Sequence, residues 1–174
     1  MNKKITLAIF SLISFNLFSQ NLTQTPPMGW NSWDCLGYHV VESQVKATAD
    51  YMSDNLISHG WEYVVIDMGW YLAQSMTSND GQLKNPPQSI DEWGRLNPHT
   101  IKFPSAKGNN GMKPLADYIH GKDLKFGIHI MRGLTYQAIA GNTPIKNSTA
   151  KAAEVANLSD TCILSGIDNS LLFY

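Results

Sequence analysis

Several kinds of residue are scarce in this chain of 174 residues, and each scarcity excludes a class of protein. Charged residues make up only 16% of the chain, the formal net charge is -1, and no segment concentrates lysine or arginine. The basic surface on which nucleic-acid binding depends is therefore missing, and adsorption to acidic membranes has no electrostatic support either. The hydrophobic fraction of 43% is that of an ordinary globular domain.

Three motifs of common enzyme classes are also absent. No G-x-G-x-x-G follows a predicted strand, which counts against a dinucleotide-binding fold. No G-x-S-x-G is present, so a serine hydrolase of the α/β type is excluded. A metal-dependent barrel hydrolase would carry His-x-His after its first strand, where this chain has Trp30-Asn31-Ser32-Trp33. We therefore expect neither a metal nor another cofactor.

Only two cysteines occur, Cys35 and Cys162. Two thiols do not make a metal site by themselves, and no histidine or further cysteine has ligand spacing beside them. In an exported protein the pair could form a disulfide, because oxidising compartments favour that bond. Two free thiols are the alternative, and the sequence does not decide between them.

A long apolar run lies at the amino terminus. Lys3 and Lys4 precede the apolar stretch 5–18, and Ser19 is a small residue at which a signal peptidase could cut. The run is short for a membrane crossing. We interpret residues 1–19 as a cleaved secretory signal peptide, with a single anchoring helix as the alternative. The protein is thus expected to be secreted or periplasmic, with no membrane attachment after cleavage.

The rest of the chain alternates short apolar runs with segments whose apolar residues recur every three to four positions. Gly60 and Gly121 stand where two of these segments should end as helices. The strands are predicted within 28–33, 63–68 and 125–131, the helices at 41–59, 114–121 and 148–158, and a long polar loop at 73–110.

This order of elements predicts parallel strands joined by right-handed helical crossovers. Both a (β/α)8 barrel and an open doubly wound sheet fit it. The barrel is favoured because polar and aromatic residues gather directly after each strand, where the active sites of TIM barrels lie. We therefore predict an α/β fold of the (β/α)8 TIM-barrel type, with about the first three βα units present. The residues after the strands are Trp33 and Asp34, Asp67 and Trp70, and His129 and Arg132.

Asp67 stands at the end of a buried strand, at the mouth of such a fold. A carboxylate there can accept hydrogen bonds from adjacent sugar hydroxyls, and Trp33 and Trp70 offer flat apolar faces for the C–H face of the same ring. This combination indicates a carbohydrate site. The alternative is that Asp67 caps the following turn and the two indoles pack into the rim. Asn31 and Asp34 are expected to shape the first loop.

Four segments together carry a resemblance to a known family: TPPMGWNSW, YVVIDMGW, GRLNPHTIKFPS and MKPLADYIHGKDLKFGIHI. In the same order and over residues 25–132, they resemble the melibiase group, glycoside hydrolase family 27, whose best-known activity is α-galactosidase. The resemblance implies a (β/α)8 catalytic barrel, of which residues 20–174 would be the N-terminal part, followed by a β-sandwich domain. It also implies retaining hydrolysis of terminal α-D-galactosyl or related residues of an oligosaccharide or other glycoside.

Carried onto this chain, the resemblance makes Trp33 the tryptophan that stacks at the sugar site and Asp67 the first of two aspartates that bind sugar hydroxyls. It puts His129 where the family commonly has a tyrosine. With Trp70 and Arg132, which the strand-end pattern adds, these are the predicted substrate-binding residues. For His129 the alternative is an internally hydrogen-bonded barrel histidine, and for Arg132 an ion pair with an acid of the rim.

The chain departs from the family pattern at Met68, which replaces the second aspartate, and in the MRG that follows the third strand. An unpaired hydroxyl in a pocket costs about 1–3 kcal/mol, so strict galactose specificity is in question. A branch that accepts a different α-linked or a β-L-arabino-configured sugar is therefore an alternative.

A retaining mechanism needs two carboxyl groups about 5–5.5 Å apart. In the family these are aspartates after the fourth and sixth strands, and neither motif occurs in this sequence. We therefore assign no catalytic residue within the chain and expect an N-terminal fragment that is inactive alone. The alternative function is that of a non-catalytic carbohydrate-binding protein that uses the same residues without chemistry.

Overall fold

The computed structural model describes residues 26–72, 88–130 and 133–156. The predicted signal peptide at 1–19 lies outside the described residues, and so does Cys162, so export and the pairing of Cys35 stay predictions. Among the described residues, no helix has the length and apolar character that a membrane crossing requires.

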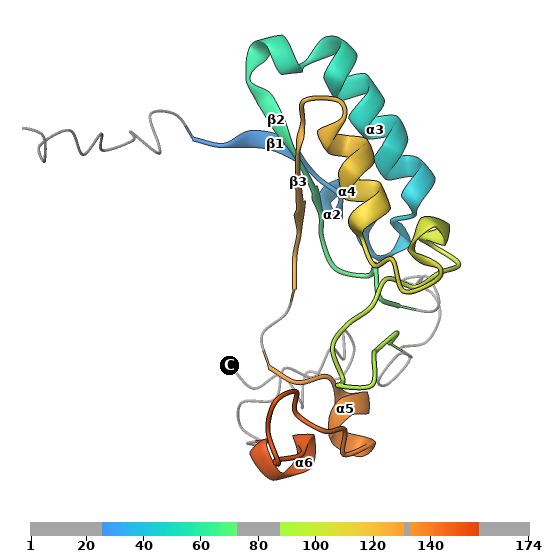
Figure 1. Cartoon of the computed structure of the whole chain (residues 1–174). Helices are drawn as coiled ribbons and strands as arrows, with labels where there is room; N and C mark the ends of the chain where they lie inside the picture. Colours follow the sequence, from blue (N-terminus) through green and yellow to red (C-terminus); the bar gives the residue numbers. More distant parts are fainter. Residues whose placement is uncertain (1–25, 73–87, 131–132, 157–174) are drawn as a thin grey trace, which may run out of the picture.

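Three parallel strands form one sheet in the order β1-β2-β3. Each connection between neighbouring strands contains a long helix, and both helices lie on the same face of the sheet (Figure 1). The predicted alternation of parallel strands and helices is therefore confirmed. The elements are β1 at Met28–Asn31, β2 at Trp61–Ile66, β3 at Lys125–Ile128, α3 at Glu42–Asn55 and α4 at Lys113–His120.

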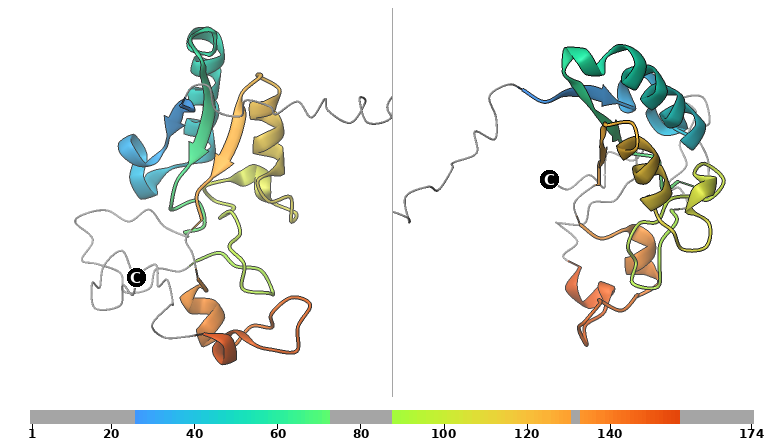
Figure 2. Two further views of the ribbon diagram at one scale, coloured as in Figure 1. Left: turned by 90° about the vertical axis from the view of Figure 1, so that its left-hand side faces the viewer. Right: turned by 45° about the horizontal axis from the view of Figure 1, so that its top comes forward.

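Shorter helices occupy the connections between these elements. α5 and α6 lie beyond the carboxyl ends of the strands, the end at which the loops after the strands also gather (Figure 2). The short elements are α2 at Trp33–Leu36, α5 at Tyr136–Ala140, α6 at Ala152–Val155, and the 3-10 helices Gly37–His39, Ile57–His59 and Pro104–Ala106.

The helix predicted at 41–59 forms as α3, followed by a 3-10 turn. Val45, Ala49 and Met52 are its buried apolar residues, and their spacing of three to four positions places them on one face. The side chain of Gln44 accepts a hydrogen bond from the backbone N–H of Val41, which satisfies one free donor at the start of the helix. Gly60 adopts a φ of 86° and turns the chain into β2.

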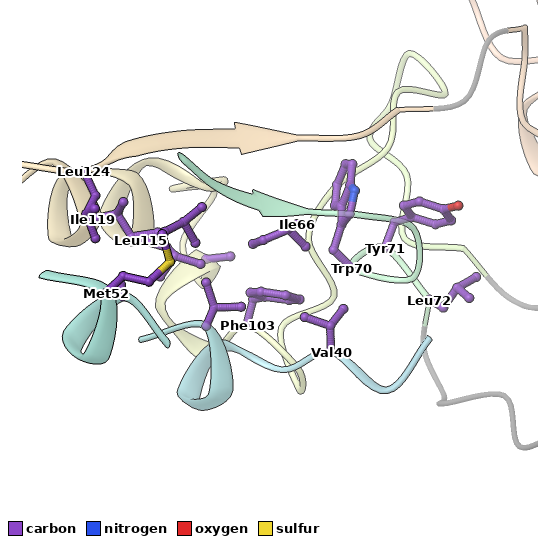
Figure 3. Packing of buried hydrophobic residues seen from close by; sticks show 14 residues of the cluster. Val40, Met52, Ile66, Trp70, Tyr71, Leu72, Phe103, Leu115, Ile119 and Leu124 are labelled. Atoms are coloured by element: carbon purple, nitrogen blue, oxygen red, sulfur yellow. The ribbon is translucent and has the colours of Figure 1, made fainter. Parts of the chain in front are cut away.

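The core lies between the sheet and these two helices (Figure 3). Val64 and Ile66 of β2 are fully buried against side chains of α3 and α4. Burial of each such side chain stabilises the fold by about 1.5–3 kcal/mol, so the path of β2 is firmly determined. Its carboxyl end, where Asp67 follows, is consequently held in place. The other labelled core residues in Figure 3 are Val40, Met52, Trp70, Tyr71, Leu72, Phe103, Leu115, Ile119 and Leu124.

The predicted boundaries of β2, β3 and the last helix are wrong. β2 spans Trp61–Ile66 rather than 63–68. β3 ends at Ile128 rather than at 131. The last helix begins at Ala152 rather than at Ser148, because the Ser148 hydroxyl accepts a hydrogen bond from the Ala150 N–H in a local turn. α5 was not predicted at all, although Thr135 caps it by accepting a hydrogen bond from the N–H three residues later.

Candidate functional site

The register of the sheet brings together the residues that follow its strands. Ile66 of β2 is paired with Ile128 of β3, so the next residues, Asp67 and His129, lie at the same level. The His129 N–H donates to the Ile66 carbonyl at 2.8 Å, which extends the ladder by one more bond. Two side chains 62 positions apart in sequence are thereby placed next to each other.

The Asp67 carboxylate is the centre of a hydrogen-bond network. Its Oδ1 lies 2.8 Å from Nδ1 of His129, and its Oδ2 accepts from Nδ2 of Asn31 at 2.9 Å. Oδ1 also accepts from the Met68 N–H at 2.7 Å, so the carboxylate caps its own turn, as the alternative interpretation expected. The same group therefore joins all three strands at their carboxyl ends.

These contacts set the charge of Asp67. Burial raises the pKa of the carboxyl, but hydrogen bonds from His129, Met68 and Asn31 outweigh burial and hold the pKa below its ordinary value. The group is therefore ionised at neutral pH. Its side chain is 14% exposed and that of His129 46%, so the pair borders solvent. An ionised carboxylate in this setting acts as a hydrogen-bond acceptor and not as a proton donor.

Ser32 holds the backbone of Asp67. The residue is fully buried, its Oγ accepts from the Asp67 N–H at 2.9 Å, and its own N–H donates to the Val65 carbonyl at 3.0 Å. Sequence reasoning did not single out this serine. Its only sequence signal is a hydroxyl at the end of the first strand.

Trp33 forms an aromatic pair with Tyr38. Their ring centroids are 4.9 Å apart and the planes meet at 86°, an edge-to-face contact. Trp33 remains 37% exposed. Its backbone N–H donates to Oδ1 of Asn31, so the Asn31 amide joins this tryptophan to Asp67. Burial, and then the charge of Asp67, raise the pKa of the Tyr38 phenol, which therefore lies in the field of that carboxylate. Tyr38 is a second site residue that sequence reasoning missed.

The prediction that Trp70 stacks on the sugar is wrong. Its side chain is only 2% exposed and packs in the core near Ile66 (Figure 3), so its indole offers no face to a sugar. The indole Nε1 donates to the carbonyl of His129 at 3.0 Å. Trp70 thus supports the backbone beneath the imidazole. The physical reason is the turn that begins at Met68 and Gly69, after which Trp70 and Tyr71 enter the core cluster.

Comparison with known proteins decides the family. The family described as alpha galactosidase A (Melibiase_2) matches residues 25–156, which is most of the chain. The chain belongs to this family. The predicted resemblance to glycoside hydrolase family 27 is thereby confirmed, and with it the (β/α)8 barrel class of the fold.

Individual relatives of the family cover this chain well but extend far beyond it. A family-27 β-L-arabinopyranosidase from Geobacillus stearothermophilus, solved in complex with arabinose, is 51% identical with a TM-score of 0.73, over 78% of this chain and 31% of that one. An alpha-galactosidase of Cyamopsis tetragonoloba is 38% identical over 65% of this chain and 23% of its own length. Alpha-galactosidase A of Cellvibrio japonicus is 36% identical over 67% and 24%. The chain thus spans about a quarter of these curated relatives.

The other predicted residues of this family member have different outcomes. Arg132 lies outside the described residues, so its role stays a prediction. Asn31 shapes the first loop as expected, and it also binds Asp67, which was not expected. Asp34 is exposed in the first turn of α2. In the described part of the chain, no group of three or more His, Cys, Asp or Glu side chains is arranged to hold a metal ion.

Proposed function

We propose that this chain supplies part of the sugar site of a glycoside hydrolase that removes a terminal α-D-galactosyl or β-L-arabinopyranosyl residue. The observation that carries the proposal is the ionised Asp67 carboxylate, joined to His129 and Asn31 beside the exposed Trp33. Family membership supports the same conclusion. Trp33, Asp67 and His129 are proposed to contact the sugar, with Tyr38 beside them and Arg132 as a further contact.

Each proposed contact has a physical role. The carboxylate accepts hydrogen bonds from ring hydroxyls, and such charge-assisted bonds are about twice as strong as neutral ones. The indole of Trp33 packs on the C–H face of the ring, and the edge-to-face contact with Tyr38 fixes its angle. The half-exposed imidazole of His129 contributes a second polar edge. The site thus contacts both the hydroxyl groups and the apolar face of one pyranose ring.

Met68 favours the arabinosyl form of this proposal. β-L-Arabinopyranose has the ring configuration of α-D-galactopyranose but lacks the exocyclic hydroxymethyl group. In the family an aspartate at the position of Met68 accepts a bond from a sugar hydroxyl, and a thioether is only a weak acceptor. A sugar with one hydroxyl fewer avoids that unpaired group. The structural relative from Geobacillus stearothermophilus, whose described activity is that of a β-L-arabinopyranosidase, agrees with this choice.

The reaction itself is proposed to be retaining, with its two catalytic carboxyl groups outside this sequence. Asp67 does not suit the role of general acid, since its hydrogen bonds keep its pKa low. A retaining enzyme needs a second carboxyl about 5–5.5 Å from the first. We therefore propose that the 174-residue chain binds sugar but does not hydrolyse glycosides. A non-catalytic carbohydrate-binding protein would use the same residues without chemistry, and glycoside hydrolysis by the protein purified from its native host would exclude that alternative.

The test is to titrate the full chain with each of three sugars and to monitor binding by NMR. The sugars are methyl β-L-arabinopyranoside, methyl α-D-galactopyranoside and methyl α-D-glucopyranoside. The arabinoside should bind best, the galactoside more weakly and the glucoside not at all. Met68→Asp should strengthen galactoside binding by about tenfold, which corresponds to about 1.4 kcal/mol. Equal binding of all three sugars, or none, would contradict the proposal. Release of p-nitrophenol from an aryl arabinoside by the 174-residue chain would contradict the assignment of catalysis to other residues.

Export of the protein is also proposed, from the signal-peptide pattern at its amino terminus. The lysines at the start, the apolar stretch 5–18 and Ser19 support a signal peptide. Sequencing the amino terminus of the protein from its native host tests this directly, and a chain that still begins at Met1 would contradict it.

A further inference from the structure

Lys102 connects two loops of the site from the inside. Its side chain is buried, with the residue 5% exposed. The ammonium Nζ donates to the carbonyl of Tyr38 at 2.5 Å and to the carbonyl of Gly69 at 3.0 Å. These acceptors are 64 and 33 positions away in the sequence. One cation thus holds together the loop after β1 and the loop after β2.

The ammonium does this without a carboxylate partner among the described residues. The ion pairs among the described residues involve other lysines, one arginine and His129, and none of them includes Lys102. Burial lowers the pKa of the Lys102 ammonium to about 8. A buried charge is costly, and a methionine would fill the same space without that cost. The residue is therefore better explained by its two hydrogen bonds than by packing.

The two carbonyls belong to the segments that carry the site. Tyr38 packs edge-to-face against Trp33, and Gly69 follows directly after Asp67 and Met68. The two loops are also in contact: a Cβ on Gly69 would lie 2.9 Å from the Cα of Tyr38. Gly69 has a φ of 96°, a backbone conformation that favours glycine. Lys102 binds both loops at the point where they touch.

We propose that Lys102 is a positioning residue that sets the separation between the aromatic face of the site, Trp33 with Tyr38, and its polar edge, Asp67 with His129. The reason for holding this separation constant rests on the proposed function, since a pyranose must contact both parts of the site at once. Its geometry does not rest on that function. Lys102 acts through the backbone of Tyr38 and Gly69 and does not touch the sugar.

The first test needs neither a variant nor a sugar. In the full chain labelled with ¹⁵N and ¹³C, the Nζ resonance of Lys102 should show couplings through hydrogen bonds to the carbonyl carbons of Tyr38 and Gly69. Coupling to neither carbon would overturn the proposal. This measurement stays decisive if a substitution at Lys102 prevents folding.

The second test compares Lys102→Met with Lys113→Met, in which a lysine that is 76% exposed is replaced in the same way. Lys102→Met should shift the NMR signals of the Trp33 indole and the His129 imidazole and weaken the binding of methyl β-L-arabinopyranoside by about tenfold. Lys113→Met should do neither. A folded Lys102→Met with unchanged indole, imidazole and affinity would overturn the proposal.

The two proposals fail separately. If the unchanged chain binds no sugar, the proposed function fails, whereas the indole and imidazole signals still decide the role of Lys102. If the chain binds sugar and Lys102→Met binds it equally well, the role of Lys102 fails and the function stands.

Discussion

Nδ1 of His129 lies 2.8 Å from Oδ1 of Asp67, although the two residues are 62 positions apart and follow different strands. The contact depends on the pairing of Ile66 with Ile128 one residue earlier. A slip of one residue in that register would move His129 to the other face of the sheet. The sheet register and the charge of the site are therefore coupled.

Removing the imidazole should make the protein less resistant to acid. Asp67 has a lowered pKa in the folded state, so its contribution to stability is present above the ordinary carboxyl pKa and is lost as pH falls through the folded value. His129→Ala should raise that folded pKa and reduce the contribution. Two measurements check this: an NMR titration of the Asp67 carboxyl carbon, and denaturant unfolding of both proteins at several pH values from 3 to 7. His129→Asn, which can keep a donor toward Asp67, is the matched control and should stay closer to the unchanged protein.

Substitution of the two tryptophans should have different main effects, loss of sugar binding at Trp33 and loss of stability at Trp70. Trp33→Ala should weaken arabinoside binding at least tenfold and lower the free energy of unfolding by about 1 kcal/mol, because the ring is exposed but contacts Tyr38. Trp70→Phe should lower it by about 2–3 kcal/mol, because the substitution removes the donor to the His129 carbonyl and leaves a space in the core where the buried indole was packed. Calorimetric titration and chemical unfolding of both variants supply the comparison. A Trp70→Phe variant that keeps full stability but loses binding would contradict the structural role of Trp70 and support a role in stacking on the sugar.

Gly69→Ala should destabilise the fold more than Gly111→Ala. Both glycines have positive φ angles, 96° and 58°, so each substitution introduces backbone strain of order 1 kcal/mol. At Gly111 a Cβ meets nothing within 4 Å, whereas at Gly69 it meets the Tyr38 backbone at 2.9 Å. We expect a loss of about 1 kcal/mol at Gly111 and of at least about 2–3 kcal/mol at Gly69. Urea unfolding of the two variants measures the difference, and equal losses would show that the loops are not in close contact.

Lys102 should give the protein a stability that rises with pH in the alkaline range. The folded pKa is about 8 and the ordinary value 10.5, so between these values the unfolded chain binds more protons than the folded one. The free energy of unfolding should then increase by about 2 kcal/mol from pH 8 to 10. The raised pKa values of Tyr38, Lys122 and Lys125 act mainly at and above pH 10, and they are common to both proteins compared. Lys102→Met should lack the increase, and parallel pH profiles of the two proteins would contradict the assigned burial.

Much of the architecture could be predicted from local patterns. The strand ending at Ile66 could be predicted because an apolar β-rich run stops at an acid, and α3 because its apolar residues keep a helical spacing. Asp67 was therefore placed correctly at the carboxyl end of a buried strand. Short elements were harder: α5 has only five residues, and its one clear signal is the capping threonine.

Site residues could be predicted only where their position relative to the end of a strand determines where the side chain lies. Trp70 comes three residues after Asp67, and nothing in that spacing tells whether its indole faces the mouth or the core. The turn through Gly69 and the contact of that glycine with Tyr38 decide it.

The sequence by itself determined the family, the order of strands and helices, and the acid that ends the central strand, because each depends on residues that are neighbours along the chain. Only the tertiary structure decided that Asn31, Ser32 and His129 hold this acid and that a buried ammonium joins the loops beside it. Those bonds connect residues more than 30 positions apart. Their partners are chosen by strand register and loop packing, and no local pattern in the chain encodes either.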